Sequence, residues 1–226
     1  MIETKNLVKE YVQGGRPLRV LNNVNLTIEK GEFMAIMGPS GSGKSTLLNM
    51  IGALDTPSSG KVYVNGIDLS TLNANQLAEL RNKEIGFIFQ QFNLVQRMDA
   101  LGNVELPLTI KGIQKSQRKE RAKKLLESVG LSDRLDHRPN QLSGGEQQRV
   151  AIARAMANDP DLFLCDELTG NLDSTTGQEI MNLLRNLNMD QGKTFVLITH
   201  DPNVAQTTDR ILQIMDGAIA GEKKYK

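Results

Sequence analysis

The chain has 226 residues, of which 39% are hydrophobic and 23% are charged, a composition that is ordinary for a globular protein. Its 27 lysine and arginine residues nearly balance its 26 aspartate and glutamate residues, which leaves a net charge of +1. A general basic field that would recruit nucleic acid or an acidic membrane is therefore excluded. A single cysteine, Cys165, excludes an internal disulfide framework and a cysteine metal cluster.

The sequence also lacks the common signals for membrane insertion and secretion. No apolar run approaches the roughly 18 to 20 residues that a membrane span requires. The N-terminus, MIETKNLVKEYV, does not show the basic-then-apolar order of a secretory signal. We therefore expect a cytosolic protein whose contact with a membrane comes through a partner.

The first half of the chain is dominated by predicted strands. The first thirty residues alternate between apolar and polar positions, with turns at Gly14-Gly15 and Gly31. A short apolar run at 33–37 is typical of a buried strand, and it leads through a glycine-rich loop into a helix at 44–51. A strand at 61–64 followed by the tight-turn pair Asn65-Gly66, and another strand at 85–89, complete this half.

The middle of the chain differs, because residues 92–160 contain no good strand pattern and two helical patterns dominate there, at 116–129 and 143–157. Strands and helices then alternate again: a strand at 162–165, a helix at 174–188, a strand at 194–199, a short helix near Pro202, and a strand at 210–215 before a turn at Gly217.

This order predicts a single α/β domain over residues 1–226 with a mostly parallel sheet. Within it, residues 1–91 and 160–226 are expected to form the core, which includes an antiparallel β part near the N-terminus. Residues 92–159 are expected to form an inserted helical subdomain.

A phosphate-binding loop is predicted between the strand at 33–37 and the helix at 44–51. The segment GPSGSGKS fits the pattern G-x-x-x-x-G-K-[ST] in the strand-to-helix context that the motif demands. Glycine amides and the helix N-terminus bind phosphate oxygens, the lysine reaches the terminal phosphates, and the last serine offers a hydroxyl to Mg²⁺. This pattern indicates ATP or GTP, and its residues are Gly38, Pro39, Ser40, Gly41, Ser42, Gly43, Lys44 and Ser45.

Two carboxylates end the apolar run at 162–165. In a parallel sheet the carboxyl ends of the strands line the ligand crevice, so Asp166 and Glu167 are expected beside the phosphate loop. Asp166 can hold Mg²⁺ through water, and Glu167 can polarise an attacking water as a general base. Without the phosphate loop, the same pattern is typical of a strand that meets a solvated turn.

Three further side chains are candidates by position. His200 follows the strand at 194–199, where it can contact a γ-phosphate or a water, although a lone histidine is usually structural. Gln90 follows the strand at 85–89 and can reach Mg²⁺ or water. Tyr11 can stack on an adenine, but a cross-strand tyrosine in a β-hairpin is an equally good interpretation.

A second glycine pair heads the helix at 143–157, in the stretch HRPNQLSGGEQQRVAIARA. Ser143 and Glu146 satisfy the capping-box spacing S-x-x-E, which needs no glycine between its ends. Gly144 and Gly145 instead leave bare amides at a positive helix end, as is typical where backbone approaches a phosphate. From spacing alone, this second site can serve the same nucleotide or the nucleotide of a partner in a dimer.

In this combination the chain resembles the nucleotide-binding subunits of ATP-binding cassette (ABC) proteins, over essentially its whole length and in motif order. The resemblance implies that Tyr11 contacts adenine, that the phosphate loop with Thr46 binds ATP, that Gln90 is the Q-loop residue and a Mg²⁺ contact, and that His200 is the switch histidine. It also implies that Gly170-Asn171-Leu172-Asp173 is the D-loop, with Asp173 near the nucleotide. In that family two subunits pair head to tail, and each ATP lies between one phosphate loop and the partner's LSGGE segment.

Within the superfamily, the stretches GFIFQQFNL at 86–94 and NVELPL at 103–108 look like the lipoprotein-release and macrolide-export group. This resemblance implies that dimer closure and reopening drive a membrane partner of export or extracytoplasmic mechanical type. The chain departs from the family pattern at Leu168, where proline is usual, so the turn that carries Glu167 is expected to be less rigid and turnover to be affected.

The sequence therefore predicts a soluble Mg²⁺-dependent ATPase subunit that forms a homodimer on ATP binding, acts on a separate integral-membrane permease at the cytoplasmic face, and binds no nucleic acid. A non-transport ABC ATPase acting on DNA or ribosomes would usually show a tandem cassette, a coiled-coil insert or a basic stripe. A GTPase would show an N/T-K-x-D motif. A regulatory ABC module that signals to a membrane complex without moving a solute has the same sequence features and stays open.

Overall fold

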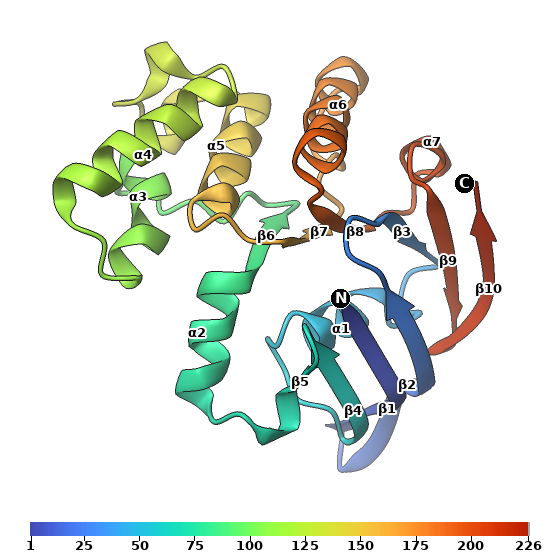
Figure 1. Cartoon of the computed structure of the whole chain (residues 1–226). Coiled ribbons are helices and arrows are strands. Elements are labelled where there is room, and N and C mark those ends of the chain that lie inside the picture. Colours follow the sequence, from blue (N-terminus) through green and yellow to red (C-terminus); the bar gives the residue numbers. More distant parts are fainter. Residues whose placement is uncertain (226) are drawn as a thin grey trace. The chain divides into compact units, whose positions relative to one another are not determined.

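The computed structural model describes residues 1–225, which divide into two compact units. The first unit comprises residues 1–81 together with the chain from Thr194 onward, and the second comprises residues 82–193 (Figure 1).

The N-terminal part of the first unit is an antiparallel sheet with the strand order β2-β1-β4-β5. The long strand β1 pairs with β2 on one side and with β4 on the other. This arrangement confirms the antiparallel β part that the sequence predicted. Its strands are β1 (Ile2–Gln13), β2 (Arg16–Ile28), β4 (Ser59–Val64) and β5 (Ile67–Asp68).

The predicted turns of this sheet are confirmed. Gly14 and Gly15 have φ of 58° and 77° between β1 and β2, and Asn65 and Gly66 have φ of 50° and 78° between β4 and β5. Two consecutive residues with positive φ match the right-handed twist of a hairpin. Glycine and asparagine tolerate this conformation better than other residues do.

The rest of the first unit is built on parallel pairing, because β3 pairs in parallel with both β8 and β9. Strand β10, which the sequence analysis did not predict, pairs antiparallel with β9. Its signal was the pair Asp216-Gly217, which has φ of 49° and 76° and joins the two strands. The elements are β3 (Phe33–Met37), α1 (Lys44–Ile51), a 3₁₀ turn at Leu69–Thr71, β8 (Thr194–Ile198), α7 (Pro202–Gln206), β9 (Arg210–Met215) and β10 (Ala218–Lys224).

The apolar runs at 33–37 and 194–198 form the centre of this part of the fold. Every residue of β8 is buried, and β3 is buried except at Met37. Phe33 lies opposite Phe195 in the parallel register, and their ring centroids are 5.4 Å apart. Continuous apolar strands are expected where a parallel sheet is covered on both faces.

The second unit combines one parallel strand pair, β6 with β7, with a group of helices. Residues 92–159 contain helices and no strand, as predicted, although their status as a separate subdomain stays a prediction. The elements are β6 (Ile85–Phe89), α3 (Ala100–Ile110), α4 (Lys115–Ser128), 3₁₀ turns at Ser132–Arg134 and Pro139–Gln141, α5 (Gly144–Met156), β7 (Leu162–Asp166) and α6 (Ser174–Gln191). Helix α2 (Ala74–Glu84) begins in the first unit and ends in the second.

Two helices were not predicted, and each has a local reason. Helix α3 contains Pro107, which lacks an N–H group and normally disfavours a helix interior. Its first turn is capped by Asp99, whose Oδ1 accepts a hydrogen bond from the Gly102 N–H at 2.7 Å. Helix α2 buries only Leu80 among its residues, so it has almost no apolar stripe to reveal it.

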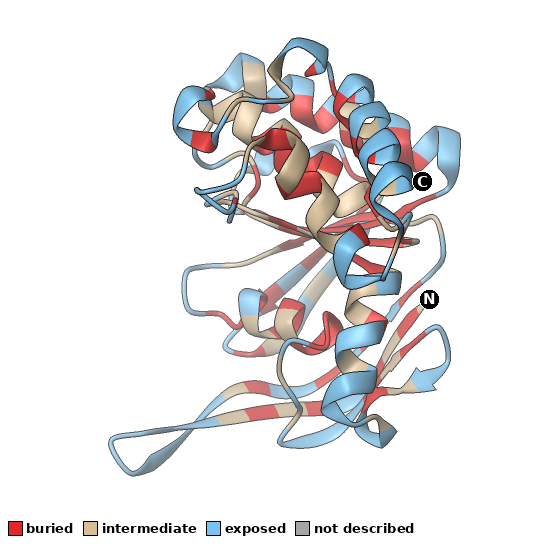
Figure 2. Ribbon diagram, turned by 90° about the vertical axis from the view of Figure 1, so that its left-hand side faces the viewer, coloured by how far each residue is buried: buried red, intermediate tan, exposed pale blue. Residues whose placement is uncertain are grey.

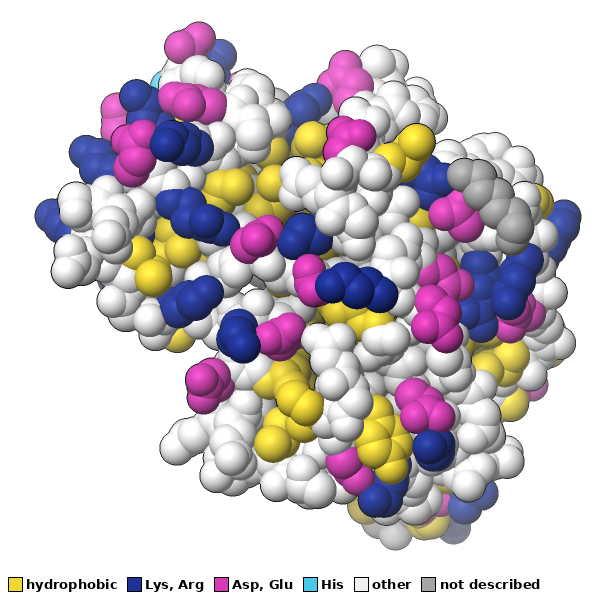
Figure 3. Space-filling view, in the orientation of Figure 1, with side chains coloured by type: hydrophobic (Ala, Val, Ile, Leu, Met, Phe, Trp, Pro, Cys, Tyr) yellow, Lys and Arg dark blue, Asp and Glu magenta, His cyan; other side chains and the backbone are white. Residues whose placement is uncertain are grey.

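The fold class therefore agrees with the prediction of an α/β protein with mostly parallel core strands, an antiparallel N-terminal sheet and a helical segment. Buried residues concentrate on the strands (Figure 2), and four consecutive residues of α5, from Val150 to Ala153, are buried as well. Basic and acidic side chains are interspersed on the visible face (Figure 3), as the small net charge leads one to expect. Within residues 1–225, no helix combines the length and apolar character that a membrane span requires.

Candidate functional site

The phosphate loop of the first unit connects β3 to α1, and hydrogen bonds from Lys44 hold its first residues in place. The Lys44 Nζ donates hydrogen bonds to the carbonyl oxygens of Gly38 at 2.9 Å and Pro39 at 2.8 Å. These two bonds hold a buried ammonium group against the start of the loop. A cation fixed beside exposed loop backbone is suited to bind phosphate oxygens.

Two glycines of this loop are required by close packing. A Cβ at Gly38 would collide with the Ile214 carbonyl oxygen of β9. Gly43 has φ of 100°, and a Cβ there would lie 2.8 Å from the Val20 carbonyl oxygen. The glycine pattern that the sequence analysis assigned to phosphate binding thus also lets the loop pack closely against β9 and β2.

The loop leaves other groups available for a ligand. Pro39, Ser40, Gly41 and Ser45 are exposed, and a Cβ at Gly41 would meet nothing within 4 Å. The Ser42 hydroxyl is buried and has no hydrogen-bond partner within residues 1–225. A buried hydroxyl without a partner is costly, so these residues fit a phosphate group or ordered water that would satisfy it.

The strand register places His200 near the phosphate loop within the first unit. Ile36 lies opposite Ile198 in the parallel pair β3–β8, and the Thr199 N–H donates to the Ile36 carbonyl oxygen at 3.2 Å. The chain then continues into the exposed His200, while β3 continues into Gly38. The two segments therefore leave the sheet at neighbouring strand ends, as the sequence predicted.

Tyr11 lies on β1, with 38% of its surface exposed. Its hydroxyl donates to the Asp55 Oδ2 at 2.9 Å, and the Thr46 side chain of α1 also interacts with it. Partial burial, followed by the hydrogen bond and charge of Asp55, raises the pKa of Tyr11. Tyr11 also lies opposite Leu18 in the hairpin register, so the cross-strand interpretation and the base-contact interpretation are compatible.

In the second unit, the parallel register brings Gln90 and the two acids together. Phe89 lies opposite Asp166 in the β6–β7 pair, so Gln90 and Glu167 follow at adjacent strand ends.

The single cysteine lies next to these acids. Burial, followed by the charge of Asp166, raises the pKa of Cys165 above its usual range. Cys165 is therefore a buried thiol, in line with the core role that the sequence indicated.

Glu167 occupies a turn with an unusual backbone conformation. Its φ is 46°, a left-handed value that is uncommon for glutamate. Its carbonyl oxygen accepts a hydrogen bond from the Gly170 N–H at 2.9 Å, and the side chain of Leu168 is buried. Leu168, which departs from the family pattern, therefore lies buried beside this turn, and the expected effect on its rigidity stays a prediction.

A link between Gln90 and the segment 170–173 was not anticipated from the sequence. The Asn171 Nδ2 donates to the Gln90 carbonyl oxygen at 3.0 Å, and the Gln90 Nε2 lies 3.4 Å from the Asn171 Oδ1. Asp173 then caps α6, and hydrogen bonds from the Thr176 hydroxyl and N–H lower the pKa of Asp173. The contacts between Gln90 and Asn171 join segments that are 81 residues apart in the sequence.

The predicted capping box at the start of α5 is confirmed. The Glu146 N–H donates to the Ser143 Oγ at 3.2 Å, and the Ser143 N–H donates to the Glu146 Oε2 at 2.8 Å. The hydrogen bond from the Ser143 N–H lowers the pKa of Glu146, partial burial opposes this shift, and Arg134 at 3.0 Å reinforces it. Glu146 therefore acts through the cap, and its carboxylate oxygens are engaged by Ser143 and Arg134.

The two glycines behind this cap differ. A Cβ at Gly145 would lie 2.5 Å from the Thr176 Cγ2, and the Thr176 hydroxyl is held by Asp173 at 2.6 Å. A Cβ at Gly144 would make only ordinary contacts, the nearest at 3.6 Å with Leu172. Packing against Thr176 within the second unit therefore requires a glycine at position 145. At position 144 the second unit has room for a Cβ, so packing does not require a glycine there.

Helix α5 also holds the segment that follows Gln90. Phe92 and Asn93 have φ of 59° and 50°, and Arg154 donates to both of their carbonyl oxygens at 2.8 Å and 2.6 Å. Desolvation by burial lowers the pKa of Arg154, which nevertheless remains protonated because an arginine does not deprotonate in proteins. Arg154 therefore ties the left-handed pair to the helix that begins at the glycines.

The candidate metal contacts are a hydroxyl, an amide and a carboxylate, at Ser45, Gln90 and Asp166. Within the described part of the chain, no group of three or more His, Cys, Asp or Glu side chains is arranged to hold a metal ion. Such a cage is not needed for Mg²⁺, which typically takes one or two protein ligands together with water and substrate phosphates. A serine hydroxyl and a strand-end carboxylate, as at Ser45 and Asp166, are ligands of that kind.

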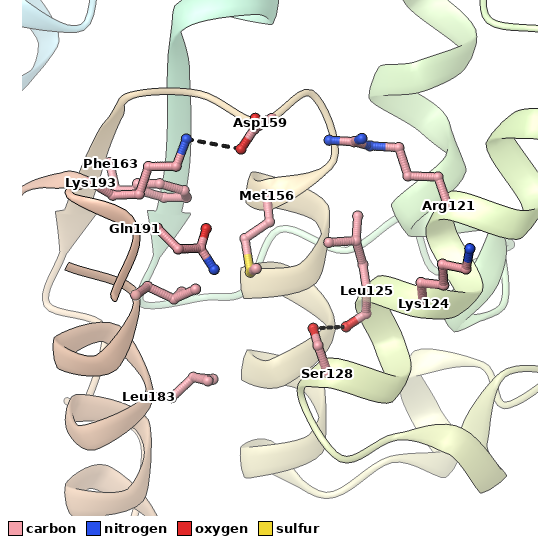
Figure 4. Close-up of a pocket in the computed structure, with 11 residues that line it drawn as sticks. Arg121, Lys124, Leu125, Ser128, Met156, Asp159, Phe163, Leu183, Gln191 and Lys193 are labelled. Atoms are coloured by element: carbon pink, nitrogen blue, oxygen red, sulfur yellow. Dashed lines mark hydrogen bonds and ion pairs between the residues drawn. The ribbon is translucent and has the colours of Figure 1, made fainter. Parts of the chain in front are cut away.

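A cavity of about 380 Å³ lies within the second unit (Figure 4). Figure 4 shows Lys193 paired with Asp159 at its rim, at 2.9 Å. The cavity borders Phe163 near the start of β7, whereas Glu167 follows the end of that strand. Ligands of parallel sheets bind at the carboxyl ends, so this cavity is distinct from the candidate site. Its lining residues are Arg121, Lys124, Leu125, Ser128, Met156, Asp159, Phe163, Leu183, Leu187, Gln191 and Lys193.

Comparison with known proteins gives consistent matches. A sequence profile described as ABC transporter matches residues 21–170. The macrolide export ATP-binding/permease protein MacB of Shewanella sp. (strain W3-18-1) is 51% identical over 224 residues, which cover 99% of this chain but 34% of that protein. MJ0796 of Methanocaldococcus jannaschii, named as an uncharacterized ABC transporter ATP-binding protein, is 51% identical over 230 residues, which cover 100% of this chain and 98% of that protein.

The fold agrees with solved structures as well. A dimeric structure of the ATP-binding cassette MJ0796, in a post-hydrolysis state bound to ADP and Pi, has a TM-score of 0.93 at 49% identity and covers 100% of this chain and 99% of that chain. A second dimeric MJ0796 structure gives the same TM-score at 50% identity.

The different roles of the two glycines give a first prediction. Gly145→Ala should lower the free energy of unfolding by about 1–3 kcal/mol, because the new methyl group overpacks against Thr176. Gly144→Ala should change it by less than about 1 kcal/mol. Thr176→Ser, which removes only the methyl group, should restore stability in the Gly145→Ala background, as measured by urea denaturation. Equal losses for both glycines would contradict this assignment.

The Arg154 contact gives a second prediction. Arg154→Met should cost about 2–4 kcal/mol because two charge-assisted hydrogen bonds are lost. Amide hydrogen exchange at residues 91–95 should become faster than elsewhere in the second unit. Arg154→Lys keeps the charge but lacks the planar fork, so it should recover only part of the protection. Unchanged exchange in Arg154→Met would show that this segment is held by other contacts.

Proposed function

The chain belongs to the ABC transporter family, and from this premise we propose that it is the subunit that binds and hydrolyses ATP to drive a separate membrane permease of export or extracytoplasmic mechanical type. The observation that carries the proposal is that the chain has two helix N-termini suited to phosphate. One follows the phosphate loop at Lys44, and the other is the Ser143-capped end of α5, where Gly144 leaves the backbone uncovered.

The first unit supplies the groups proposed for ATP binding. The Lys44 ammonium and the amides of the loop from Gly38 to Thr46 bind the phosphates, and the Tyr11 ring contacts the base. Exposed Ser40 and Gly41, together with the unpartnered Ser42 hydroxyl, support this assignment. His200, which leaves the sheet next to the loop, contacts the γ-phosphate.

The second unit supplies the groups proposed for hydrolysis. Glu167 accepts a proton from the attacking water as it adds to the γ-phosphorus, and ADP leaves with the bridging oxygen. The left-handed backbone at Glu167 supports a functional role, since strained residues cluster at active sites. Gln90, which the register places beside this turn, orients water and contacts Mg²⁺, and Asn171 positions Gln90 through their hydrogen bonds.

The metal expected with ATP is Mg²⁺, held by the Ser45 hydroxyl, Gln90 and, through water, Asp166. When bound, Mg²⁺ neutralises charge that develops on the phosphate oxygens. A hydroxyl, an amide and a carboxylate are oxygen donors that fit a metal whose remaining ligands are water and substrate phosphates.

The second phosphate-facing helix end is proposed to act in a dimer. Two copies would pair head to tail, so that Ser143, Gly144 and Gly145 of one copy contact the γ-phosphate held by the phosphate loop of the other, with Asp173 close to the shared interface. The similarity to dimeric cassettes at a TM-score of 0.93 supports this arrangement. Gly145 has the packing role described above, so Gly144 and the Ser143 hydroxyl are the main expected contacts.

The proposed partner of the dimer is an integral-membrane permease at the cytoplasmic face. The chain spans about a third of the length of the MacB relatives, which are named as ATP-binding/permease proteins, and nearly all of MJ0796. Both sets of relatives carry transporter names, which favours coupled transport over the regulatory module that sequence features alone left open. A transport assay with the reconstituted complex would contradict this choice if ATP turnover altered another enzyme and moved no solute.

The role of Glu167 predicts that Glu167→Gln binds ATP with nearly unchanged affinity but loses most hydrolysis, a drop of about 100-fold or more if Glu167 is the general base. ATP-bound dimers should accumulate, which size-exclusion chromatography with light scattering can measure. Glu120→Gln, an exposed glutamate of α4, is the matched control and should hydrolyse ATP normally. Undiminished turnover in Glu167→Gln would rule out the general-base role.

The role of Ser143 predicts that Ser143→Arg prevents ATP-driven dimerisation, because a bulky cation occupies the place of the partner's phosphate, while ATP binding to the monomer stays nearly intact. Ser116→Arg places the same substitution on the exposed first turn of α4 and should dimerise normally. The substitution also removes the N-cap of α5, which costs about 1 kcal/mol of stability. Thermal melting should therefore show that Ser143→Arg is still folded. Collapse of monomer binding would instead indicate that Ser143 serves the nucleotide of its own chain.

A further inference from the structure

One face of the Tyr11 ring is covered by a buried ammonium group. Lys9 and Tyr11 are two residues apart on β1, so their side chains lie on the same face of the strand. The Lys9 Nζ lies 4.8 Å from the centroid of the Tyr11 ring. Lys9 is only 8% exposed, whereas Tyr11 is 38% exposed. The ring therefore has a cation on one side and accessible surface elsewhere.

The ammonium group is fixed by acceptors from another segment. The Lys9 Nζ donates to the Asp55 Oδ1 at 2.8 Å and to the Thr56 carbonyl oxygen at 2.7 Å. Both acceptors belong to the turn that follows α1, the helix that begins at the phosphate loop. A buried lysine with two short hydrogen bonds has little rotamer freedom, so it is a rigid support for the ring.

The same carboxylate holds the other end of the tyrosine. The Tyr11 hydroxyl donates to the Asp55 Oδ2 at 2.9 Å, so Asp55 bridges Lys9 and Tyr11. Partial burial works against ionisation of Asp55, but hydrogen bonds from Lys9, the Thr56 N–H and Tyr11 prevail and lower the pKa of Asp55. Asp55 is therefore an ionised acceptor and Tyr11 a protonated donor near neutral pH.

These contacts connect the ring to the segment that follows α1, the helix that begins at the phosphate loop. Asp55 and Thr56 follow the C-terminal end of α1, and they bind Tyr11 and Lys9, respectively, with Asp55 binding both. The orientation of the ring is thus set relative to the helix whose N-terminus binds phosphate. An aromatic ring has a negative face that attracts a cation, and with Lys9 on one face only the opposite face remains for stacking.

We propose that Lys9 and Asp55 are positioning residues that hold the Tyr11 ring so that its free face stacks on the purine base of a nucleoside triphosphate bound at the phosphate loop. The inference rests on the proposed function, in which Tyr11 is the base contact. A ring that is already ordered avoids the free-energy cost of ordering on binding. This gain in binding free energy comes from contact with the base, so the affinity for the phosphates alone should not change.

The test compares a ligand that has a base with one that lacks it. In Lys9→Met, isothermal titration calorimetry should show about a 2- to 10-fold weaker Kd for ATP, the range expected when one side chain must be ordered on binding. The Kd for inorganic tripolyphosphate, measured with the same Mg²⁺ concentration, should not change. Asp55→Asn, which weakens the same anchor with a smaller change of shape, should show the same selective loss.

The chain offers a matched control on the same strand. The Lys5 Nζ lies 5.1 Å from the centroid of the Tyr63 ring, in an exposed contact of the same type. Lys5→Met should therefore leave the affinities for ATP and tripolyphosphate unchanged. This control separates the specific support of Tyr11 from a general effect of removing a lysine from β1.

A double-mutant cycle distinguishes positioning from a structural role. Tyr11→Ala should weaken ATP binding by about 5- to 100-fold, the range for loss of base stacking, and Lys9→Met should add no further loss in that background. Equal losses for ATP and tripolyphosphate in Lys9→Met, or additive losses in the double variant, would overturn the inference. The inference would also be overturned if Lys9→Met bound ATP with normal affinity while Tyr11→Ala bound ATP more weakly. In that case the role of Tyr11 as the base contact would still stand. Normal ATP affinity in Tyr11→Ala would overturn that role and the inference together.

Discussion

Parallel pairing between continuous apolar strands is the constraint on which the candidate site depends. Because β3 and β8 run in the same direction and bury nearly all their side chains, polar residues can emerge only where the strands end. The phosphate loop and His200 emerge at one such edge. Gln90 and Glu167 emerge likewise at the ends of β6 and β7. In each unit, the burial of the core strands therefore determines that the candidate functional residues lie at the strand ends.

Residues around these strand ends combine structural and functional demands. Gly38 and Gly43 allow close packing of backbone, and they also keep the phosphate loop free of side chains. Gly145 accommodates Thr176, so its lack of a side chain is not a sign of ligand binding alone. Gly144 has no such neighbour. A glycine-rich motif is thus a mixture of positions that serve the fold and positions that remain for a ligand, and only the surrounding atoms separate the two.

Charged groups away from the expected phosphates act mainly by fixing geometry. Arg154 binds the carbonyl oxygens of two left-handed residues after Gln90, and Glu146 closes the cap of α5. Asp55 joins Lys9 to the Tyr11 hydroxyl. In the cases of Glu146 and Asp55, the helix end or ring that is restricted is one that is proposed to touch nucleotide, and its restriction lowers the ordering cost of binding.

The amino-acid sequence alone was enough to predict most of the strand–helix order, the hairpin turns, the capping box and the family resemblance, because each depends on residues close together in the chain or on motifs in a fixed order. It missed α3, whose Pro107 hides a helix that neighbouring elements support, and it left Leu168 as a departure from pattern. The tertiary structure decided that Leu168 packs inside, that Asn171 holds Gln90, and that Gly145 faces Thr176. These facts depend on contacts between distant segments, which local propensity cannot encode.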